Sequence, residues 1–489
     1  MSSLRLVALL AIPAHLAFGQ QAPAGPGASL TLDDAIVTAE RNNPQFQQIR
    51  NNVRTANAQV RIAQGALLPS ANVNFRTGYQ QGGTQIVQGL SFPSAATYSS
   101  AYSLGLSYNL APSVLYAPKA ARATRDASEA DVTSQAEILR SQVTTQYITA
   151  LQSAAQAAVN DTLVQSAAGQ LDLVNAKNKV GAANIVDVRT AEVALGQAQV
   201  AALTAHNQAQ IDKLKLFQLM GVPADLSVRL TTDFSLAVPN FSLDSLIDLA
   251  RRVNPDLAAK KSTEYASEMN VKVARTQYLP SLFLSTGYAA QAFGFANPDG
   301  LALQEQQSVA NSFANCMFAD SLRAGAGLPP LSQPCGTGIA TPEQVAAARA
   351  SNRPFQFNKA PYGLSAQISL PIFNNFQREA TIEQNKVARD NALADVRSRT
   401  LQITTDVTQA YLTMVTDART VELQTQTAAK ASEELAAAQE RYKVGAATFL
   451  DVTVARGTYE LAQINRVTSI YQYHKAFAAL ENAVGRPLR

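Results

Sequence analysis

One long stretch of sequence recurs in the second half of the chain, and this duplication limits the possible folds most strongly. Leu32–Ser70 aligns without a gap with Leu243–Ser281 at an offset of 211, with 12 identities in 39 positions. Lys179–Ala183 and Lys443–Ala447 repeat one pentapeptide at an offset of 264. Because the offset grows, the second copy carries an insertion. We therefore predict two structural repeats, 20–240 and 241–489, with a Gly- and Pro-rich, aperiodic insertion at 291–360.

Each copy has the pattern of a helix, two strands, a very long helix, a turn and a further helix. In the second copy, 377–444 runs for 68 residues without proline. Apolar side chains follow the heptad spacing of packed helices at Ile403, Val407, Ala410, Met414 and Val421. Such a helix would be about 100 Å long. In the first copy, Pro44 predicts a break in the helical stretch 32–64. The predicted fold class is therefore mainly α, with a small antiparallel β part.

Four short segments alternate apolar and polar residues, as half-buried strands do. They are 71–79, 101–110, 281–290 and 361–370. Their length and alternation suit strands of a transmembrane barrel, with one face to lipid and one to a wet lumen. A half-buried sheet of a soluble domain would show the same alternation. Four strands cannot close a barrel around a pore, so a barrel would have to be shared, and three chains would supply twelve strands.

The tyrosines nearest the hairpin loops carry a further prediction. Tyr79 with Tyr102, and Tyr288 with Tyr362, are expected at one height in their hairpins. They would form an aromatic girdle at the outer membrane interface.

The N-terminus has the features of a cleaved export signal. Arg5 precedes an apolar core at 6–16, and Ala17-Phe18-Gly19 offers small residues for cleavage. We therefore predict a signal peptide at 1–19, and no cysteine near the cut for lipidation. A buried first helix is the alternative. No stretch approaches the roughly 20 consecutive apolar residues of a membrane-spanning helix.

Charge and composition argue against several functional classes. A formal net charge of +4 over 489 residues argues against a nucleic-acid partner held by bulk electrostatics. Two cysteines and three histidines leave little for a metal site, and no phosphate-binding loop or nucleophile motif occurs. We predict no cofactor, no metal and no catalytic residue. Cys316 and Cys335 both lie in the insertion, and export favours a disulfide between them over two free thiols.

These pieces together resemble the outer membrane efflux proteins of the TolC type, over nearly all of the mature chain. The resemblance rests on Leu30–Ile36 with Asn42-Asn43-Pro44, on a Leu-Pro-Ser triplet before the first strand of each copy, on Leu370–Phe373, and on the repeated pentapeptide. It implies a homotrimer with a twelve-stranded outer-membrane barrel and a long periplasmic α-helical barrel. It also implies a passive exit duct, not an enzyme, for drug pumps or type I protein secretion, with metal-ion efflux as a third possibility. A periplasmic adaptor protein would link it to an inner-membrane transporter.

The resemblance also assigns roles to individual residues. The turns at 180–184 and 444–448 match the helix tips that meet the adaptor, with contacts expected from the residues listed here: Val180, Gly181, Ala182, Val444, Gly445, Ala446 and Thr448. Asp187, Asp451 and Tyr442 match the periplasmic aperture, where the pore narrows. The two aspartates would equally complement the positive end of their helices. Ala447 and Val454 stand where some members carry an arginine latch and a second acid, so Lys179 and Arg189 are the remaining candidates for a latch.

The residues leave one other class of function open. A soluble periplasmic coiled-coil scaffold or adaptor would also combine an export signal, long helices and small sheets used for protein contacts. Membrane fractionation distinguishes this protein class from an outer-membrane channel in contact with lipid.

Overall fold

The computed structural model describes residues 29–87, 90–232, 241–352, 356–359 and 361–488, with side chains omitted at 85–94. The predicted signal peptide 1–19 lies outside the described residues, and so does the end of the first predicted repeat at 233–240. The chain divides into two compact units. One unit consists of Met1–Asn57, Ala123–Ser267 and Ala388–Arg489, and the other consists of Ala58–Arg122 and Glu268–Val387. Each unit therefore contains segments of both sequence copies.

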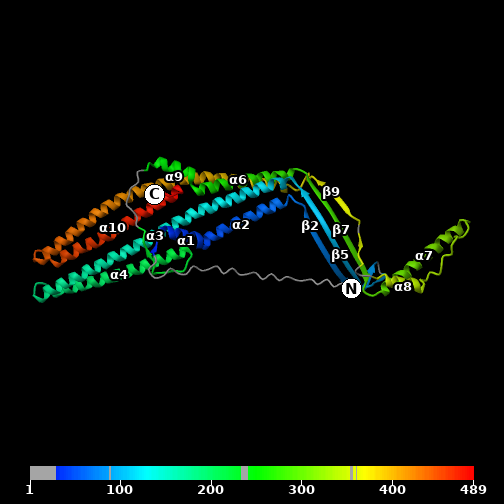
Figure 1. The fold of residues 1–489 in the computed structure, drawn as a ribbon, viewed down its shortest axis with the longest axis horizontal. Helices are drawn as coiled ribbons and strands as arrows, with labels where there is room; N and C mark the ends of the chain where they lie inside the picture. Colours follow the sequence, from blue (N-terminus) through cyan, green and yellow to red (C-terminus); the bar gives the residue numbers. More distant parts are fainter. Residues whose placement is uncertain (1–28, 88–89, 233–240, 353–355, 360, 489) are drawn as a thin grey trace. The chain divides into compact units, whose positions relative to one another are not determined.

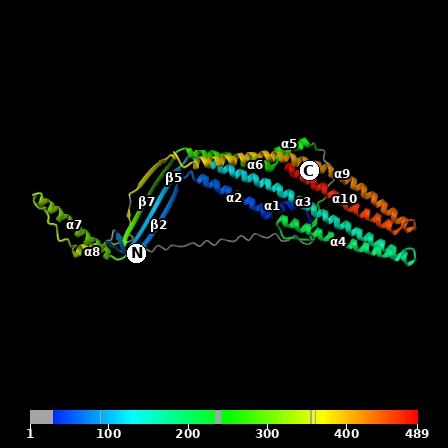
Figure 2. The same cartoon turned by 180° about the vertical axis from the view of Figure 1, so that it is seen from behind.

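Helices dominate the first unit, and they repeat in order. The first copy supplies α1 (Leu32–Asn42), α2 (Pro44–Gly65), α3 (Pro112–Lys179) and α4 (Ile185–Met220). The second copy supplies α5 (Leu243–Val253), α6 (Pro255–Arg275), α9 (Gln377–Lys443) and α10 (Phe449–Val484). The pairs α3–α4 and α9–α10 each run side by side to a tight turn (Figures 1 and 2). A short parallel pairing joins β1 (Ser29–Leu30) to β6 (Arg229–Leu230).

The predicted break at Pro44 is confirmed, because α1 ends at Asn42 and α2 begins at Pro44. The second copy repeats the break at Pro255. At each break a buried asparagine ties the chain to the last turn of a long helix. The Asn43 side-chain amide donates to the Leu219 carbonyl at 2.8 Å, and that of Asn254 donates to the Ala483 carbonyl at 3.1 Å. Each Asn-Pro pair therefore ends one helix, begins the next, and anchors the break to a neighbouring helix.

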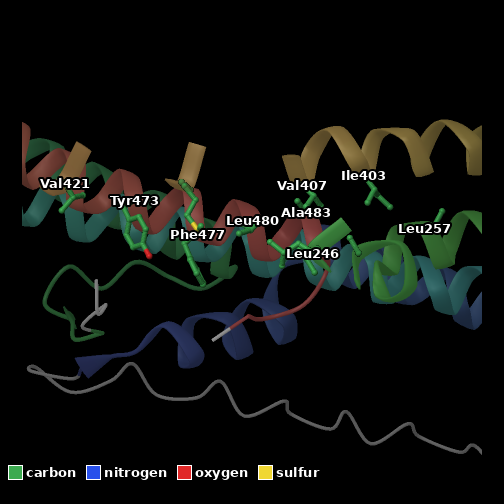
Figure 3. Packing of buried hydrophobic residues seen from close by; sticks show 13 residues of the cluster. Leu246, Leu257, Ile403, Val407, Val421, Tyr473, Phe477, Leu480 and Ala483 are labelled. Atoms are coloured by element: carbon green, nitrogen blue, oxygen red, sulfur yellow. The ribbon is translucent and has the colours of Figure 1, made fainter. Parts of the chain in front are cut away.

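Each copy has its own apolar core in the first unit, and equivalent positions fill both. Leu139 and Val143 of α3 pack with Leu216 of α4 in one core, whereas Ile403, Val407 and Leu480 occupy the matching places in the other (Figure 3). The second core is built from the residues listed here: Leu246, Ala250, Leu257, Ile403, Val407, Met414, Val421, Tyr473, Ala476, Phe477, Leu480, Ala483 and Val484. Of the predicted heptad positions, Ala410 is half-buried against this core and the other four are buried. Heptad packing therefore holds the long helices together.

The second unit contains an antiparallel sheet of long strands. These are β2 (Ser70–Gln80), β5 (Thr97–Leu110), β7 (Ser281–Phe295) and β9 (Gly363–Ser369), in the order β2-β5-β7-β9 (Figure 1). Two-residue β8 (Asn358–Lys359) also pairs with β7, and β3 (Gly83–Val87) pairs with β4 (Leu90–Ser94) in a separate hairpin. β5 begins four residues before the predicted strand, and β7 ends five residues after it.

The insertion is more regular than its aperiodic sequence predicted. It contains α7 (Asp299–Gly325) and the shorter α8 (Pro342–Ala350), which follow β7 (Figure 2). Cys316 and Cys335 form a disulfide within this arm. An ion pair of 2.9 Å between Arg349 and Asp299 joins the end of α8 to the start of α7. The insertion therefore forms an ordered helical arm, made of α7 and α8. The contacts with α8 and the disulfide stabilise α7, whose sequence has only weak helical periodicity.

Candidate functional site

The two turns that end α3 and α9 have the same backbone structure. Gly181 and Gly445 adopt φ values of 75° and 77°, the left-handed conformation that favours glycine. In the first turn, the amide of Ala182 donates to the Lys177 carbonyl and that of Gly181 to the Asn178 carbonyl. The second turn repeats both bonds. This is a Schellman motif, which satisfies the last carbonyls of each long helix.

The helix that follows each turn begins with a capping box. Asn184 accepts from the Asp187 amide at 2.9 Å, and the Asp187 carboxylate accepts from the Asn184 amide at 3.3 Å. Thr448 and Asp451 make the equivalent pair of bonds before α10. The Thr448 backbone N–H, and then its hydroxyl, hold the pKa of the Asp451 carboxyl below its usual range. Asp451 is exposed and Asp187 is half-buried, so the cap leaves the charge of Asp451 fully open to solvent.

The two turns lie against each other within the first unit. Tyr442 of α9 is 5% exposed and packs in an apolar cluster with residues from α3, α4 and α10. The cluster consists of Val174, Val188, Ala191, Leu435, Tyr442, Phe449, Val452 and Ala455. The Tyr442 hydroxyl is buried without a hydrogen-bond partner among the described residues. Burial, and then the charge of Asp187, raise the pKa of the Tyr442 phenol. The structure therefore brings Tyr442 and Asp187 of the predicted aperture set together.

A lysine that sequence reasoning missed joins the two turns. Lys177 of α3 donates to the main-chain carbonyl of Tyr442, and its ammonium lies 4.2 Å from the centroid of the Tyr442 ring. Of the two latch candidates, Arg189 pairs at 2.7 Å with Glu192 of its own helix, and Lys179 is exposed. Lys177 follows buried Val174 by three residues, so it lies on the buried side of α3. The three-residue spacing between Val174 and Lys177 is the sequence signal that could have identified this lysine.

The sheet of the second unit has one apolar and one mainly polar face, as the alternation predicted. Residues opposite each other in an antiparallel pair share a face, so the register assigns the faces. The apolar face is listed here: Val73, Phe75, Tyr79, Tyr98, Tyr102, Leu104, Leu106, Tyr288, Leu284, Leu282, Leu364, Ala366 and Ile368. Serine, asparagine, glutamine and Arg76 dominate the other face, with Phe283, Phe293 and Phe295 as exceptions.

The register corrects the predicted heights of the tyrosines. Tyr79 lies opposite Tyr98, with ring centroids 5.1 Å apart, whereas Tyr102 lies opposite Phe75. Tyr79 and Tyr102 are therefore not at one height, because β5 begins earlier than predicted. Tyr102 instead approaches Tyr288 of β7, at 6.2 Å between ring centroids, and Tyr362 lies just before the first residue of β9.

In the described part of the chain, no three His, Cys, Asp or Glu side chains gather as a metal site would require. None of the helices described is both long enough and apolar enough to cross a membrane.

The duplicated helix pairs with matching turns, together with the two-faced sheet, define the fold of known outer-membrane channels. The outer membrane protein VceC of Vibrio cholerae shares this fold with a TM-score of 0.67 and 16% identity, over 94% of this chain and 97% of that one. The Campylobacter jejuni CmeC outer membrane channel does so with a TM-score of 0.68 and 17% identity, over 93% and 85%.

The sequence identifies the family. Residues 35–222 and 343–486 match the outer membrane efflux protein family, and the chain belongs to it. It is 29% identical over 260 residues to the toluene efflux pump outer membrane protein TtgF of Pseudomonas putida, which is 52% of this chain and 53% of that protein. It is 25% identical over 277 residues to the pyoverdine export outer membrane protein OpmQ of the same species, 55% and 58% respectively. The chain thus spans about half the length of the curated relatives that it matches.

Proposed function

We propose that this chain is the outer-membrane exit channel of a tripartite efflux system, a passive conduit that works as a homotrimer. The observation that carries the proposal is the exposed apolar face of the sheet. Phe75, Leu104 and Ile368 are 65%, 49% and 76% exposed on that face. In water such an apolar face would promote aggregation, whereas in a bilayer it is the surface that contacts lipid.

The edges of the sheet support the trimer. Within the described residues, β2 forms one edge and β9 the other. Open strand edges are not tolerated in lipid, because their N–H and C=O groups find no water. Three chains joined from β9 to β2 would close a ring of twelve strands and leave no edge.

The paired turns support an adaptor as partner. Val180 and Val444 are 79% and 77% exposed at neighbouring turns, and small residues follow both. An exposed valine flanked by glycine and alanine lets a partner helix approach closely. In this proposal Val180–Ala182, Val444–Ala446 and Thr448 contact a periplasmic adaptor, which connects the channel to an inner-membrane transporter. Asp187, Asp451 and Tyr442 then line or brace the aperture beside that contact.

The cargo in this proposal is a small organic compound. The family match and both relatives carry efflux or export names, one for toluene and one for pyoverdine. Expression in a strain that lacks its own outer-membrane efflux channel would restore resistance to small organic compounds only when the matching adaptor and pump are present.

Cell fractionation and conductance measurements test whether the protein is a channel of the outer membrane. After cell fractionation, the mature protein is expected in the outer-membrane fraction, to cross-link as a trimer in detergent, and to conduct ions in planar bilayers. Recovery of the protein in the soluble periplasmic fraction without detergent would contradict the channel proposal.

A pair of substitutions tests the adaptor contact. Val180→Glu with Val444→Glu should abolish adaptor capture and leave conductance intact, whereas Lys430→Glu, at an exposed site on α9, should affect neither.

A further inference from the structure

A charged groove lies where the helices of the second unit meet the sheet. It holds about 410 Å³ and is lined by Arg275, Tyr278, Glu379, Ile382, Glu383 and Lys386. Two cationic and two anionic side chains therefore surround one opening, and Lys386 pairs with Glu383 of the same helix at 3.0 Å. The wall from α6 and the 3₁₀ turn Thr276–Tyr278 faces the wall from the first turns of α9.

Contacts with the neighbouring Arg378 hold two of the lining residues, Tyr278 and Glu379, in place. The Arg378 guanidinium lies 4.0 Å from the centroid of the Tyr278 ring and is only 9% exposed. It donates to the Pro371 carbonyl at 2.9 Å and to the Glu379 carboxylate at 3.0 Å. The Tyr278 hydroxyl donates to the same carboxylate at 3.2 Å. The Glu379 carboxylate is thus fixed at one side of the opening, with its charge paired to Arg378.

The groove lies close to the end of the apolar face of the sheet. Tyr278 precedes Ser281, the first residue of β7, by three residues, which span at most about 10 Å. The headgroup layer on each side of a bilayer is about 5–8 Å thick. If the sheet crosses the membrane, the groove opens at the level of the phospholipid headgroups.

Exposed apolar side chains adjoin the groove along the chain. Leu279, Ile372, Phe373 and Phe376 are 50%, 88%, 67% and 66% exposed. The rings of Phe373 and Phe376 pack edge to face at 5.4 Å. Asn375 and Phe376 both adopt positive φ, at 56° and 62°, a strained conformation for residues other than glycine. The segment between β9 and α9 therefore adopts a strained backbone conformation in which two aromatic rings are exposed.

We propose that this groove binds the headgroup of a zwitterionic phospholipid of the phosphatidylethanolamine type in the periplasmic leaflet. Arg275 and Lys386 suit the phosphate, because both are cationic donors. Glu379 and Glu383 suit the ammonium group of the same headgroup. The apolar rim of Ile372, Phe373 and Phe376 lies against the acyl chains. This inference rests on the proposed outer-membrane function.

The first copy of the repeat lacks the anionic half of this site. At the offset of 211, Gln64 and Leu67 stand for Arg275 and Tyr278. At the offset of 264, Leu115, Lys119 and Arg122 stand for Glu379, Glu383 and Lys386. The duplication therefore supplies a matched control within the same chain, and each chain carries the site once.

Lipid retention measured by native mass spectrometry tests the proposal. The whole mature protein is released from mixed micelles that contain phosphatidylethanolamine and phosphatidylglycerol. The unaltered protein should retain phosphatidylethanolamine in preference. Arg275→Ala with Lys386→Ala should weaken that retention about twenty-fivefold, which is about fivefold for each basic residue at a membrane surface. Glu379→Gln with Glu383→Gln should remove the preference over phosphatidylglycerol. Lys119→Ala with Arg122→Ala should behave like the unaltered protein.

Three results would overturn the site: equal retention after loss of Arg275 and Lys386, an equal loss in the first-copy control, or a preference for phosphatidylglycerol at the start. Conductance in planar bilayers separates this site from the channel itself. A conducting protein without the lipid preference overturns the lipid site alone. A protein that never enters the membrane fraction overturns both.

Discussion

The ammonium of Lys177, near the end of α3, lies over the ring of Tyr442, near the end of α9, and donates to its main-chain carbonyl. One side chain of the first copy thereby caps the end of the long helix of the second. The Tyr442 carbonyl also accepts from Gly445 at 3.1 Å, so Lys177 reinforces the turn from outside. The two turns are joined by this cation and by the apolar cluster around it.

Lys177→Met should loosen the contact between the two turns. Methionine keeps the apolar stem and removes the cation, so about 1 kcal/mol of cation–π and hydrogen-bond stabilisation is lost. Hydrogen exchange of the amides at the end of α9 should accelerate about fivefold. Lys179→Met, two residues away at an exposed site, is the control. Equal acceleration in both variants would show that Lys177 has no special role.

Replacing Asp187 and Asp451 by asparagine separates charge from capping. Asparagine still accepts a hydrogen bond from the N-cap amide, so the helices should remain capped while two carboxylates are lost. The cation selectivity of single channels should fall. Glu433→Gln, exposed on α9, should leave it unchanged. If the double variant keeps its selectivity, the aspartates serve only as helix caps.

Selectivity should also resist mild acid. Thr448 lowers the pKa of the folded Asp451 carboxyl, so its charge persists as the pH falls through about 4, the ordinary range for aspartate. Its contribution to selectivity, and to capping of α10, is complete above that range and is lost only as the pH falls through the lowered folded pKa. Reversal potentials recorded from pH 7 down to 3 check this. A loss already complete at pH 5 would contradict it.

Adjacent positions on β5 test which face of the sheet meets lipid. Leu104 lies on the apolar face and Ser103 on the polar face, both in the middle of the strand. Leu104→Lys should cost about 2–4 kcal/mol of stability in the bilayer, whereas Ser103→Lys should be tolerated. Folding into phospholipid vesicles, followed by urea titration, measures the difference. Similar costs at both positions would argue for a sheet that does not span a membrane.

Reduction should loosen the α7–α8 arm without unfolding the rest of the chain. The Cys316–Cys335 bond links residues 19 apart, and a loop of that size contributes about 3 kcal/mol against opening of the arm. Cys316→Ser with Cys335→Ser should therefore be cut faster by protease at 326–340. A reducing agent should speed cleavage of the unaltered protein and have no effect on the double variant. A reductant effect on that variant would point to another cause.

Local sequence signals predicted much of the fold because they report local physics. Pro44 ends a helix since it lacks an N–H donor, and Gly181 and Gly445 sit where positive φ is needed. Gly485 also adopts positive φ, at 88°, but glycine is needed there for a second reason that the sequence alone could not show. A Cβ there would lie 2.6 Å from the Cδ of Pro255, so the glycine also permits close packing between α10 and the start of α6.

By itself, then, the sequence determined the duplication, the helical turns, the heptad cores and the alternation of the strands. Each depends on residues close together in the chain or on a regular period of burial. Only the tertiary structure decided which tyrosines face each other, that α7 forms in the insertion, and that Lys177 rather than Lys179 reaches the second turn. These depend on strand register and on side chains brought together over hundreds of residues, which no local pattern encodes.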